Sequence, residues 1–223
     1  MQFLYHPDAG LPDITIEGEA YRYIFKVRRH NEGERIALRN LTNEYLYFYR
    51  IDRVTKKEAE LVLEEKEARI VMPRRRLHIG WCVVDPKTVE KSLPMLNEMG
   101  VTKISFVYCD RSQKNFKPDF ERLHRILVNS SQQCGRSEMM SLETFDSAAS
   151  YLEAYPKSAI LDFGGASLQC ETPFESILIG AEGGFCEEER KLFENRPIYG
   201  METPLVLRSE SAAIAVASLT LMR

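Results

Sequence analysis

The chain has 223 residues, of which 44% are hydrophobic and 28% are charged, and its formal net charge is −3. This length suits one large domain or two small ones, and the composition is ordinary for a soluble globular protein. The slightly acidic balance argues against a protein that coats nucleic acid non-specifically. No apolar run is long enough to span a membrane, and the first residues lack the features of a signal peptide, so we expect a cytoplasmic protein.

The cysteines give no sign of a disulfide framework or of a metal site. They are odd in number and scattered, and no two have CxxC spacing, at Cys82, Cys109, Cys134, Cys170 and Cys186. Reduced thiols are therefore the expectation, and no metal is predicted.

Positive charge is concentrated in two stretches of the chain. Residues 21–39 carry six Lys or Arg against two Glu, and residues 103–136 carry seven against three acidic residues. Phosphate contacts need clustered cations rather than a basic average, so both stretches are candidate nucleic-acid contacts. The alternative is that each stretch is simply a solvated face.

In chain order, the first third is rich in short strands. Polar and apolar residues alternate over residues 35–41 and 59–63, and an aromatic run fills residues 45–51. Short strands separated by polar turns predict a small barrel or sandwich. The aromatic side chains of the middle strand are candidates for stacking on bases, but about half of them should face the core of an alternating strand.

The pattern changes after a charged linker at residues 64–76, which predicts one domain at residues 1–70 and a second at residues 71–223. In the second domain, apolar strands alternate with amphipathic helices. Strands are expected at residues 77–84, 104–108, 158–163 and 176–179, and helices at residues 88–99, 119–134, 148–155 and 187–195. This alternation predicts an α/β domain with a mostly parallel sheet covered on both faces.

The last segment, residues 212–222, is apolar on nearly every side and rich in alanine. A helix with this pattern is buried rather than surface-lying, and it needs cover from its own domain or from a partner subunit. The segment therefore suggests a homodimer.

Two loops near the C-terminus are the strongest candidates for a functional site. Residues 178–184, Leu-Ile-Gly-Ala-Glu-Gly-Gly, and residues 207–212, Leu-Arg-Ser-Glu-Ser-Ala, each lie between an apolar run and a predicted helix. Open α/β sheets bind ligands at such loops, at the carboxyl ends of strands. The first loop lacks phosphate-loop spacing, and Glu182 would repel a phosphate, so it better suits a neutral or cationic ligand. The alternative is a glycine turn with no ligand.

The second loop contains a cation that capping does not explain. Ser209 or Ser211 is expected to cap the last helix, and Glu210 is favourable near the positive end of its dipole. Arg208 lies at the same end, where the dipole disfavours it. We therefore expect Arg208 to contact substrate or phosphate.

Motifs over essentially the whole chain resemble the RsmE family of 16S rRNA uridine-N3 methyltransferases, within the SPOUT class. They are Ile-Gly-Ala-Glu-Gly-Gly-Phe-Cys at 179–186, Leu-Arg-Ser-Glu-Ser-Ala at 207–212, Glu-Met-Gly-Val at 98–101, Arg-Ser at 111–112, Gln-Gln-Cys-Gly-Arg at 132–136, and Val-Arg-Arg at 27–29 followed by Gly-Glu at 33–34. Each motif is weak alone, but six in the same order make a specific match.

The resemblance implies a PUA-like β-barrel that helps to hold RNA, followed by a SPOUT α/β domain with a trefoil knot. It also implies a homodimer, a substrate in 16S ribosomal RNA or the small ribosomal subunit, and S-adenosylmethionine held among three loops. The implied cofactor contacts are Leu161, Ile179, Gly180, Glu182, Gly183, Gly184, Leu207, Ser209 and Ala212.

The implied chemistry singles out several charged side chains. Uracil N3–H is weakly acidic, so methyl transfer needs its proton removed or the resulting anion stabilised. Arg208 and Arg29 are candidates for stabilising the anion, and Glu210 is a candidate general base, although capping alone would also explain it. The implied RNA contacts are Arg28, Arg29, Arg111 and Arg136. Because N3 lies on the pairing edge, the substrate base must be single-stranded or flipped.

Other interpretations of the sequence remain open. Another SPOUT specificity, such as ribose 2′-O or guanine-N1 methylation, would use the same cofactor loops. A non-catalytic rRNA-binding assembly factor would need no S-adenosylmethionine. A nucleotide-binding enzyme with an ordinary open sheet is disfavoured by the acidic glycine loop and the absence of a P-loop.

Overall fold

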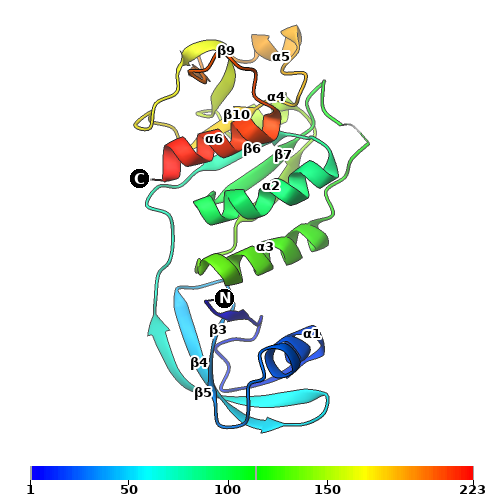
Figure 1. The fold of residues 1–223 in the computed structure, drawn as a ribbon. Helices are drawn as coiled ribbons and strands as arrows, with labels where there is room; N and C mark the ends of the chain where they lie inside the picture. Colours follow the sequence, from blue (N-terminus) through cyan, green and yellow to red (C-terminus); the bar gives the residue numbers. More distant parts are fainter. Residues whose placement is uncertain (1, 114, 223) are drawn as a thin grey trace. The chain divides into compact units, whose positions relative to one another are not determined.

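The computed structural model describes residues 2–113 and 115–222, which form two compact units (Figure 1). The first unit extends to Met72 and also includes Ser131–Met139, and the second comprises the rest of the chain. The short return segment is tied to the first unit through backbone contacts. Gln2 N donates to Gln132 O at 2.8 Å, and Ser137 N donates to Val71 O at 3.0 Å. A nine-residue stretch within the predicted second domain thus packs with the first unit.

The first unit is built on a five-stranded mixed sheet in the order β1-β3-β4-β5-β2. Only β1 and β3 run parallel, and β1 and β2 are the edge strands. Its elements are β1 (Leu4–Tyr5), β2 (Asp13–Glu17), α1 (Gly18–Tyr21), the π-helix η1 (Arg22–Val27), β3 (Arg35–Arg39), β4 (Tyr45–Val54) and β5 (Glu58–Ala68). The three strands predicted from alternation are confirmed as β3, β4 and β5, and the sheet is a curled half-barrel with two free edges.

The aromatic run of β4 is divided between the core and the surface. Tyr47 and Tyr49 are buried, with 7% and 0% of their surface exposed, because alternate residues of a strand face the same side. Tyr45 and Phe48 are half-buried, and the Arg35 guanidinium lies 4.6 Å from the centre of the Phe48 ring. The prediction that about half of this run packs in the core is confirmed.

The second unit contains a six-stranded, fully parallel sheet in the order β11-β9-β10-β6-β7-β8. Its strands are β6 (His78–Cys82), β7 (Lys103–Val107), β8 (Ser141–Phe145), β9 (Ala159–Ser167), β10 (Ser176–Ile179) and β11 (Ile198–Gly200), and its helices are α2 (Pro86–Met99), α3 (Phe120–Cys134, whose end belongs to the first unit), α4 (Ala148–Ala154), α5 (Glu187–Lys191) and α6 (Ser209–Leu221). The predicted α/β class is confirmed. Strands β8 and β11 were not predicted, because neither contains a continuous apolar run.

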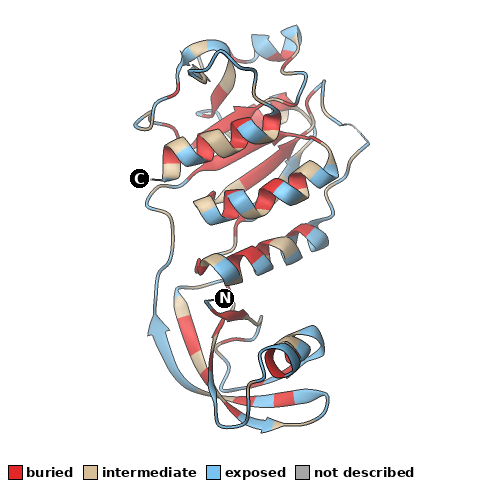
Figure 2. Ribbon diagram, viewed as in Figure 1, coloured by how far each residue is buried: buried red, intermediate tan, exposed pale blue. Residues whose placement is uncertain are grey.

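Successive side chains of β6 point to opposite faces of the sheet. His78 contacts Tyr151 of α4, and a Cβ on Gly80 would come within 2.4 Å of the same Tyr151 ring. Trp81 points to the opposite face, where its indole contacts Ser209 at the start of α6. Helices α2 and α6 lie next to each other on that face, and the strands beneath them are buried (Figures 1 and 2).

The ends of α2 follow from local chemistry. Asp85 is the N-cap, and its carboxylate accepts hydrogen bonds from Lys87 N at 3.0 Å and Thr88 N at 3.1 Å. Pro86 occupies the first helical position, where its missing N–H costs nothing. Gly100 ends the helix at φ 101°, a conformation that favours glycine, so the predicted C-cap is confirmed.

Cys82 and Cys109 form a disulfide, with Cα atoms 5.7 Å apart. The expectation of reduced thiols was wrong for this pair, because neighbouring parallel strands bring together two cysteines that lie 27 residues apart in the chain. Cys134, Cys170 and Cys186 are free. None of the described helices is both long enough and apolar enough to cross a membrane.

Candidate active site

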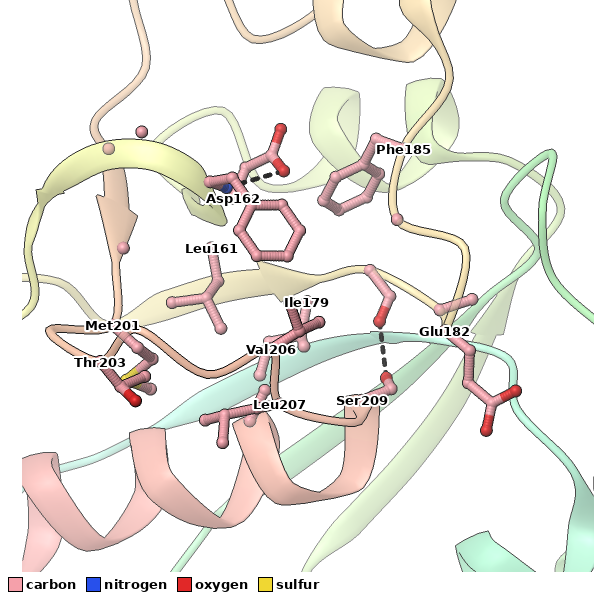
Figure 3. A pocket seen from close by; sticks show the side chains of 18 of the residues that line it. Leu161, Asp162, Ile179, Glu182, Phe185, Met201, Thr203, Val206, Leu207 and Ser209 are labelled. Carbon is pink, nitrogen blue, oxygen red and sulfur yellow. Dashed lines mark hydrogen bonds between the residues drawn. The ribbon is translucent and has the colours of Figure 1, made fainter.

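A cavity of about 660 Å³ lies at the carboxyl ends of β9, β10 and β11 (Figure 3). Three segments form most of its wall: the end of β9, the loop after β10, and the stretch from Gly200 to Ser209. Strand β10 is inserted between β9 and β6, so the cavity opens where the strand order reverses. Open α/β sheets bind ligands at such a point.

Every residue implied as a cofactor contact lines this one cavity. They are Leu161, Ile179, Gly180, Glu182, Gly183, Gly184, Leu207, Ser209 and Ala212. These residues come from three separate stretches of the chain, and the fold brings them together. Their contact with a cofactor stays a prediction.

The two loops singled out in the sequence are joined by a buried hydroxyl. Ser209 Oγ donates to Gly180 O at 2.6 Å and accepts a hydrogen bond from Trp81 Nε1 at 2.8 Å. Ser209 is the first residue of α6, whose N-cap is Arg208, and no side chain caps the helix there. The prediction of a serine N-cap was wrong, because the Ser209 hydroxyl joins the two cavity walls instead.

The glycines of the β10 loop allow close packing of its backbone. A Cβ on Gly180 would lie 3.3 Å from Gly184 Cα, and Gly184 itself has φ +65°. A Cβ on Gly183 would lie 3.1 Å from Arg111 Cδ. The close packing of this loop depends on its glycines, and every residue from Gly180 to Gly184 lines the cavity. That its backbone groups contact a ligand stays a prediction.

The acidic residue that the sequence singled out in this loop does not point into the cavity. Glu182 is exposed, and Figure 3 shows its carboxylate pointing away from the apolar side chains of the cavity. Asp162 in the middle of β9 also lines the cavity, and its side chain is 9% exposed, whereas a third lining acid, Glu202, is exposed. The Asp162 carboxylate accepts two hydrogen bonds from Arg190, at 2.8 and 3.1 Å.

This ion pair neutralises the acid and clamps β9 to α5. Two parallel N–H···O bonds to a carboxylate are among the stronger and more directional polar contacts. Asp162 also raises the pKa of Arg190 through these hydrogen bonds and its charge. The sequence did not point to Asp162, since a single acid within a strand carries no motif.

Two of the three candidate catalytic side chains, Arg208 and Glu210, are chain neighbours of residues that line the cavity. The Arg208 side chain is 79% exposed, and its Nη1 lies 4.0 Å from Glu210 Oε1. Glu210 Oε2 is buried, and no hydrogen-bond partner for it is found among the described residues. Neither side chain belongs to the cavity lining, whereas the flanking Leu207 and Ser209 do.

The four predicted RNA contacts lie in quite different surroundings. Arg111 lines the cavity and donates to Gly183 O at 2.6 Å. Arg28 and Arg29 are exposed in the first unit, and Arg29 has a positive φ of 61°. Arg136 is 6% exposed, and its Nε donates to Glu138 O at 2.8 Å, which favours a structural role for it.

The sequence did not predict most of the cavity lining that β9 provides, nor the segment of the lining that precedes Arg208. The lining residues that were not predicted as contacts are Asp162, Phe163, Gly164, Gly165, Ser167, Ala181, Phe185, Arg190, Gly200, Met201, Glu202, Thr203, Leu205 and Val206. The one available signal was the Gly164-Gly165 pair directly after a strand. The exposed apolar residues among them have no sequence signature, because exposure depends on what the fold leaves uncovered.

Comparison with known proteins places these features in one family. An RNA methyltransferase domain model matches residues 72–221, and an RNA methyltransferase PUA domain model matches residues 16–64. Ribosomal RNA small subunit methyltransferase E of Helicobacter pylori is 44% identical over 98% of this chain and 99% of its own length.

Solved structures agree on the fold. A ribosomal RNA small subunit methyltransferase E from Neisseria gonorrhoeae, bound to S-adenosylmethionine, has a TM-score of 0.81 at 17% identity and covers 98% of this chain and 95% of its own. A Legionella pneumophila methyltransferase in complex with the same cofactor has a TM-score of 0.83 at 23% identity, covering 98% and 96%. The predicted PUA-like first domain and methyltransferase second domain are confirmed. The chain belongs to the ribosomal RNA small subunit methyltransferase E family, and the rRNA methyltransferase predicted from its motifs is confirmed with it.

Proposed function

We propose that this protein binds S-adenosylmethionine in the cavity at the carboxyl ends of β9, β10 and β11, and that it methylates N3 of a uridine in 16S ribosomal RNA. The observation that carries the proposal is the convergence of the three predicted cofactor segments on one wall. The trefoil knot implied by the motifs stays a prediction about the same loops.

The residues present suit this cofactor. The inner wall is apolar and closely packed: Ile179, Ala181, Phe185 and Ala212 are 2%, 8%, 1% and 8% exposed. The β10 loop adds backbone donors and acceptors, which can recognise an adenine edge without a side-chain charge. Arg190 neutralises Asp162, the least exposed of the acidic residues that line the cavity. An apolar pocket with few fixed polar groups is typical of a small-molecule site.

When bound, S-adenosylmethionine supplies an electrophilic methyl group on a sulfonium. The protein has to do the rest: exclude water, hold the base, and favour the deprotonated imide. Arg208 is the proposed electrostatic stabiliser, because it follows the cavity wall directly and its guanidinium is exposed. Arg29 is the second candidate, and it lies in the first unit.

Glu210 is proposed either to remove the proton from uracil N3 or to position the Arg208 guanidinium. Its Oε1 faces the guanidinium at 4.0 Å, and its buried Oε2 has an unused acceptor position among the described residues. A general base must come within hydrogen-bond reach of N3–H, directly or through one water. Glu210→Gln would preserve the shape and remove the base, so a loss of turnover in this variant would support the first role.

We also propose a homodimer formed through α6. Ser209, Ala213 and Val216 are buried in their own unit, while Ile214 and Leu219 remain half-exposed on a helix with no charged residue after Glu210. An apolar face of this kind favours a partner surface. Sedimentation equilibrium at micromolar concentration tests this, and a monomer would contradict it.

Two measurements test the proposed function. Calorimetry with S-adenosylhomocysteine should give a binding isotherm, and an absence of heat would favour a non-catalytic RNA-binding role. Mass spectrometry of 16S rRNA nucleosides from a strain lacking the protein should show the loss of N3-methyluridine. Intact N3-methyluridine would exclude this specificity, and the loss of a 2′-O-methyl or guanine-N1 mark would replace it.

A further inference from the structure

Phe163 is an aromatic side chain left open to solvent in the wall of the cavity. It is 72% exposed, whereas the next most exposed phenylalanine, Phe120, is at 42%. Two more apolar residues of the lining share this property, Leu205 at 73% and Val206 at 77%. The cavity thus has a buried inner wall and an exposed apolar rim.

The backbone that presents Phe163 is held firmly. Phe163 N donates to Asp162 Oδ1 at 2.9 Å, and Arg190 fixes that carboxylate through two hydrogen bonds. On the other side, Gly165 lies so close to β11 that a Cβ there would come within 2.7 Å of Ile198 O. Phe163 is the fifth residue of β9, and contacts on both sides fix the backbone that presents its exposed ring.

The two halves of the cavity suit two different ligands. The small, fully enclosed residues of the inner wall match a cofactor that is wrapped by the protein. A base of an RNA strand arrives from solvent and must be unpaired before its N3 is reached. It therefore meets the rim first, and one flat ring at the rim offers it a stacking surface.

We propose that the exposed rim is the subsite for the target pyrimidine base, and that Phe163 stacks on that base. The inference rests on the proposed function and names a substrate-binding residue for it. Stacking would fix the plane of the base and replace the neighbours that it loses on flipping. Leu205 and Val206 would border the same subsite with apolar surface.

The test compares three variants at this position with a matched control. Phe163→Leu keeps an apolar side chain without a ring face, Phe163→Ala removes it, and Phe163→Trp restores an aromatic face. Phe120→Ala removes an exposed phenylalanine on α3 that does not line the cavity. The assay is tritiated methyl transfer from S-adenosylmethionine to 30S subunits from cells lacking this protein, with S-adenosylhomocysteine affinity measured in parallel.

We expect Phe163→Ala and Phe163→Leu to raise the KM for the 30S subunit by about 5- to 150-fold, the range expected for loss of one base–aromatic stack. Phe163→Trp should restore most of that loss, and Phe120→Ala should change nothing. S-adenosylhomocysteine affinity should stay within about twofold of the parent protein in every variant, because the ring contacts the base and not the cofactor.

Three results would overturn the inference. A parallel loss of S-adenosylhomocysteine affinity would place the ring against the cofactor, and a change of oligomeric state would place it in a subunit interface. An unchanged KM in Phe163→Ala would leave it without a role in substrate binding. In all three cases the parent protein still binds S-adenosylhomocysteine and transfers methyl groups, so the proposed function stands. If the parent does neither, both proposals fail together.

Discussion

Two regions of the parallel sheet differ sharply in how they use polar side chains. On the face covered by α4, a connected network runs from His78 Nε2 to Ser105 Oγ at 2.7 Å and on to Glu143 at 2.5 Å. Glu143 also accepts hydrogen bonds from Lys103 at 2.8 Å and Tyr155 at 2.7 Å. The cavity at the carboxyl ends of β9, β10 and β11 also holds a strong polar contact in the Asp162–Arg190 pair, but its lining leaves the apolar side chains of Phe163, Leu205 and Val206 exposed.

The comparison shows that density of titratable groups does not by itself locate the site. The network has the residue types of a catalytic centre, but Ser105 is fully buried, and burial lowers the pKa of His78 to about 4. Its members satisfy one another, as buried polar groups in a stable core do. The cavity instead leaves donors, acceptors and apolar faces open, and that is what a ligand needs.

The largest effect should come from Arg208→Ala. If this guanidinium stabilises the imidate anion, its removal should lower methyl transfer by about 100- to 1,000-fold while S-adenosylhomocysteine affinity stays near that of the parent protein. Radiolabelled methyl transfer and calorimetry give the two numbers. Equal losses in both would make Arg208 part of the cofactor pocket, and Arg29→Ala is the matched test of the second candidate.

Breaking the Cys82–Cys109 disulfide should lower the free energy of unfolding by about 2–4 kcal/mol, because it closes a loop of 27 residues in the unfolded chain. Urea denaturation with and without reductant measures this. The double variant Cys82→Ala/Cys109→Ala should show no difference between the two conditions. A parent protein equally stable in both would show that the bond does not contribute.

The network should make stability depend on pH through His78. Burial is the largest cause of its low pKa, the charge of Lys103 adds to it, and Glu143 opposes it. The folded state therefore binds the proton less readily than the unfolded state, whose His pKa is near its ordinary value of 6.5. Stability is fully present above pH 6.5 and is lost as the pH falls towards 4, by about 3 kcal/mol in total.

Urea denaturation at pH 7, 5.5 and 4.5 tests this, with His78→Gln as the reference. Glu143 and other acids contribute to acid sensitivity in both proteins, so the difference between them isolates His78. If the free energies of unfolding of the parent protein and of His78→Gln fall by the same amount over this pH range, His78 does not cause the pH dependence. Methyl transfer at pH 7 should differ little between the two, because the network is separate from the cavity.

The smallest effect should follow Ser209→Ala. It removes the hydroxyl that joins Trp81 to Gly180 and leaves a buried indole N–H without its partner, at a cost of about 1–3 kcal/mol in unfolding free energy. S-adenosylhomocysteine should also bind severalfold more weakly, because the β10 loop loses its anchor. Ser209→Thr keeps the hydroxyl and serves as the control. Unchanged stability and affinity in Ser209→Ala would show that the Ser209 hydroxyl supports neither the fold nor the cofactor site.

Local signals were enough for the regular elements with strong patterns. The cap at Asp85 and the turn at Gly100 bound α2 as expected, and the apolar runs became β6, β7, β9 and β10. Strands β1, β8 and β11 escaped prediction, because pairing with neighbours rather than their own composition makes them strands. Strand β2 also escaped prediction, although Asp13–Glu17 alternates polar and apolar residues. Glu182 was placed in the correct loop, but its direction was not predictable from its neighbours.

The sequence by itself determined the α/β class and the two loops that line the cavity, because apolar periodicity and polar or glycine-containing loops after apolar runs are local properties. The family followed from the resemblance of its motifs. Only the tertiary structure decided which charges face a ligand. It buried Arg136, turned Glu182 outward, paired Asp162 with Arg190 and left Phe163 uncovered. The Asp162–Arg190 pair joins residues 28 positions apart, and burial and exposure exist only once such segments have packed together.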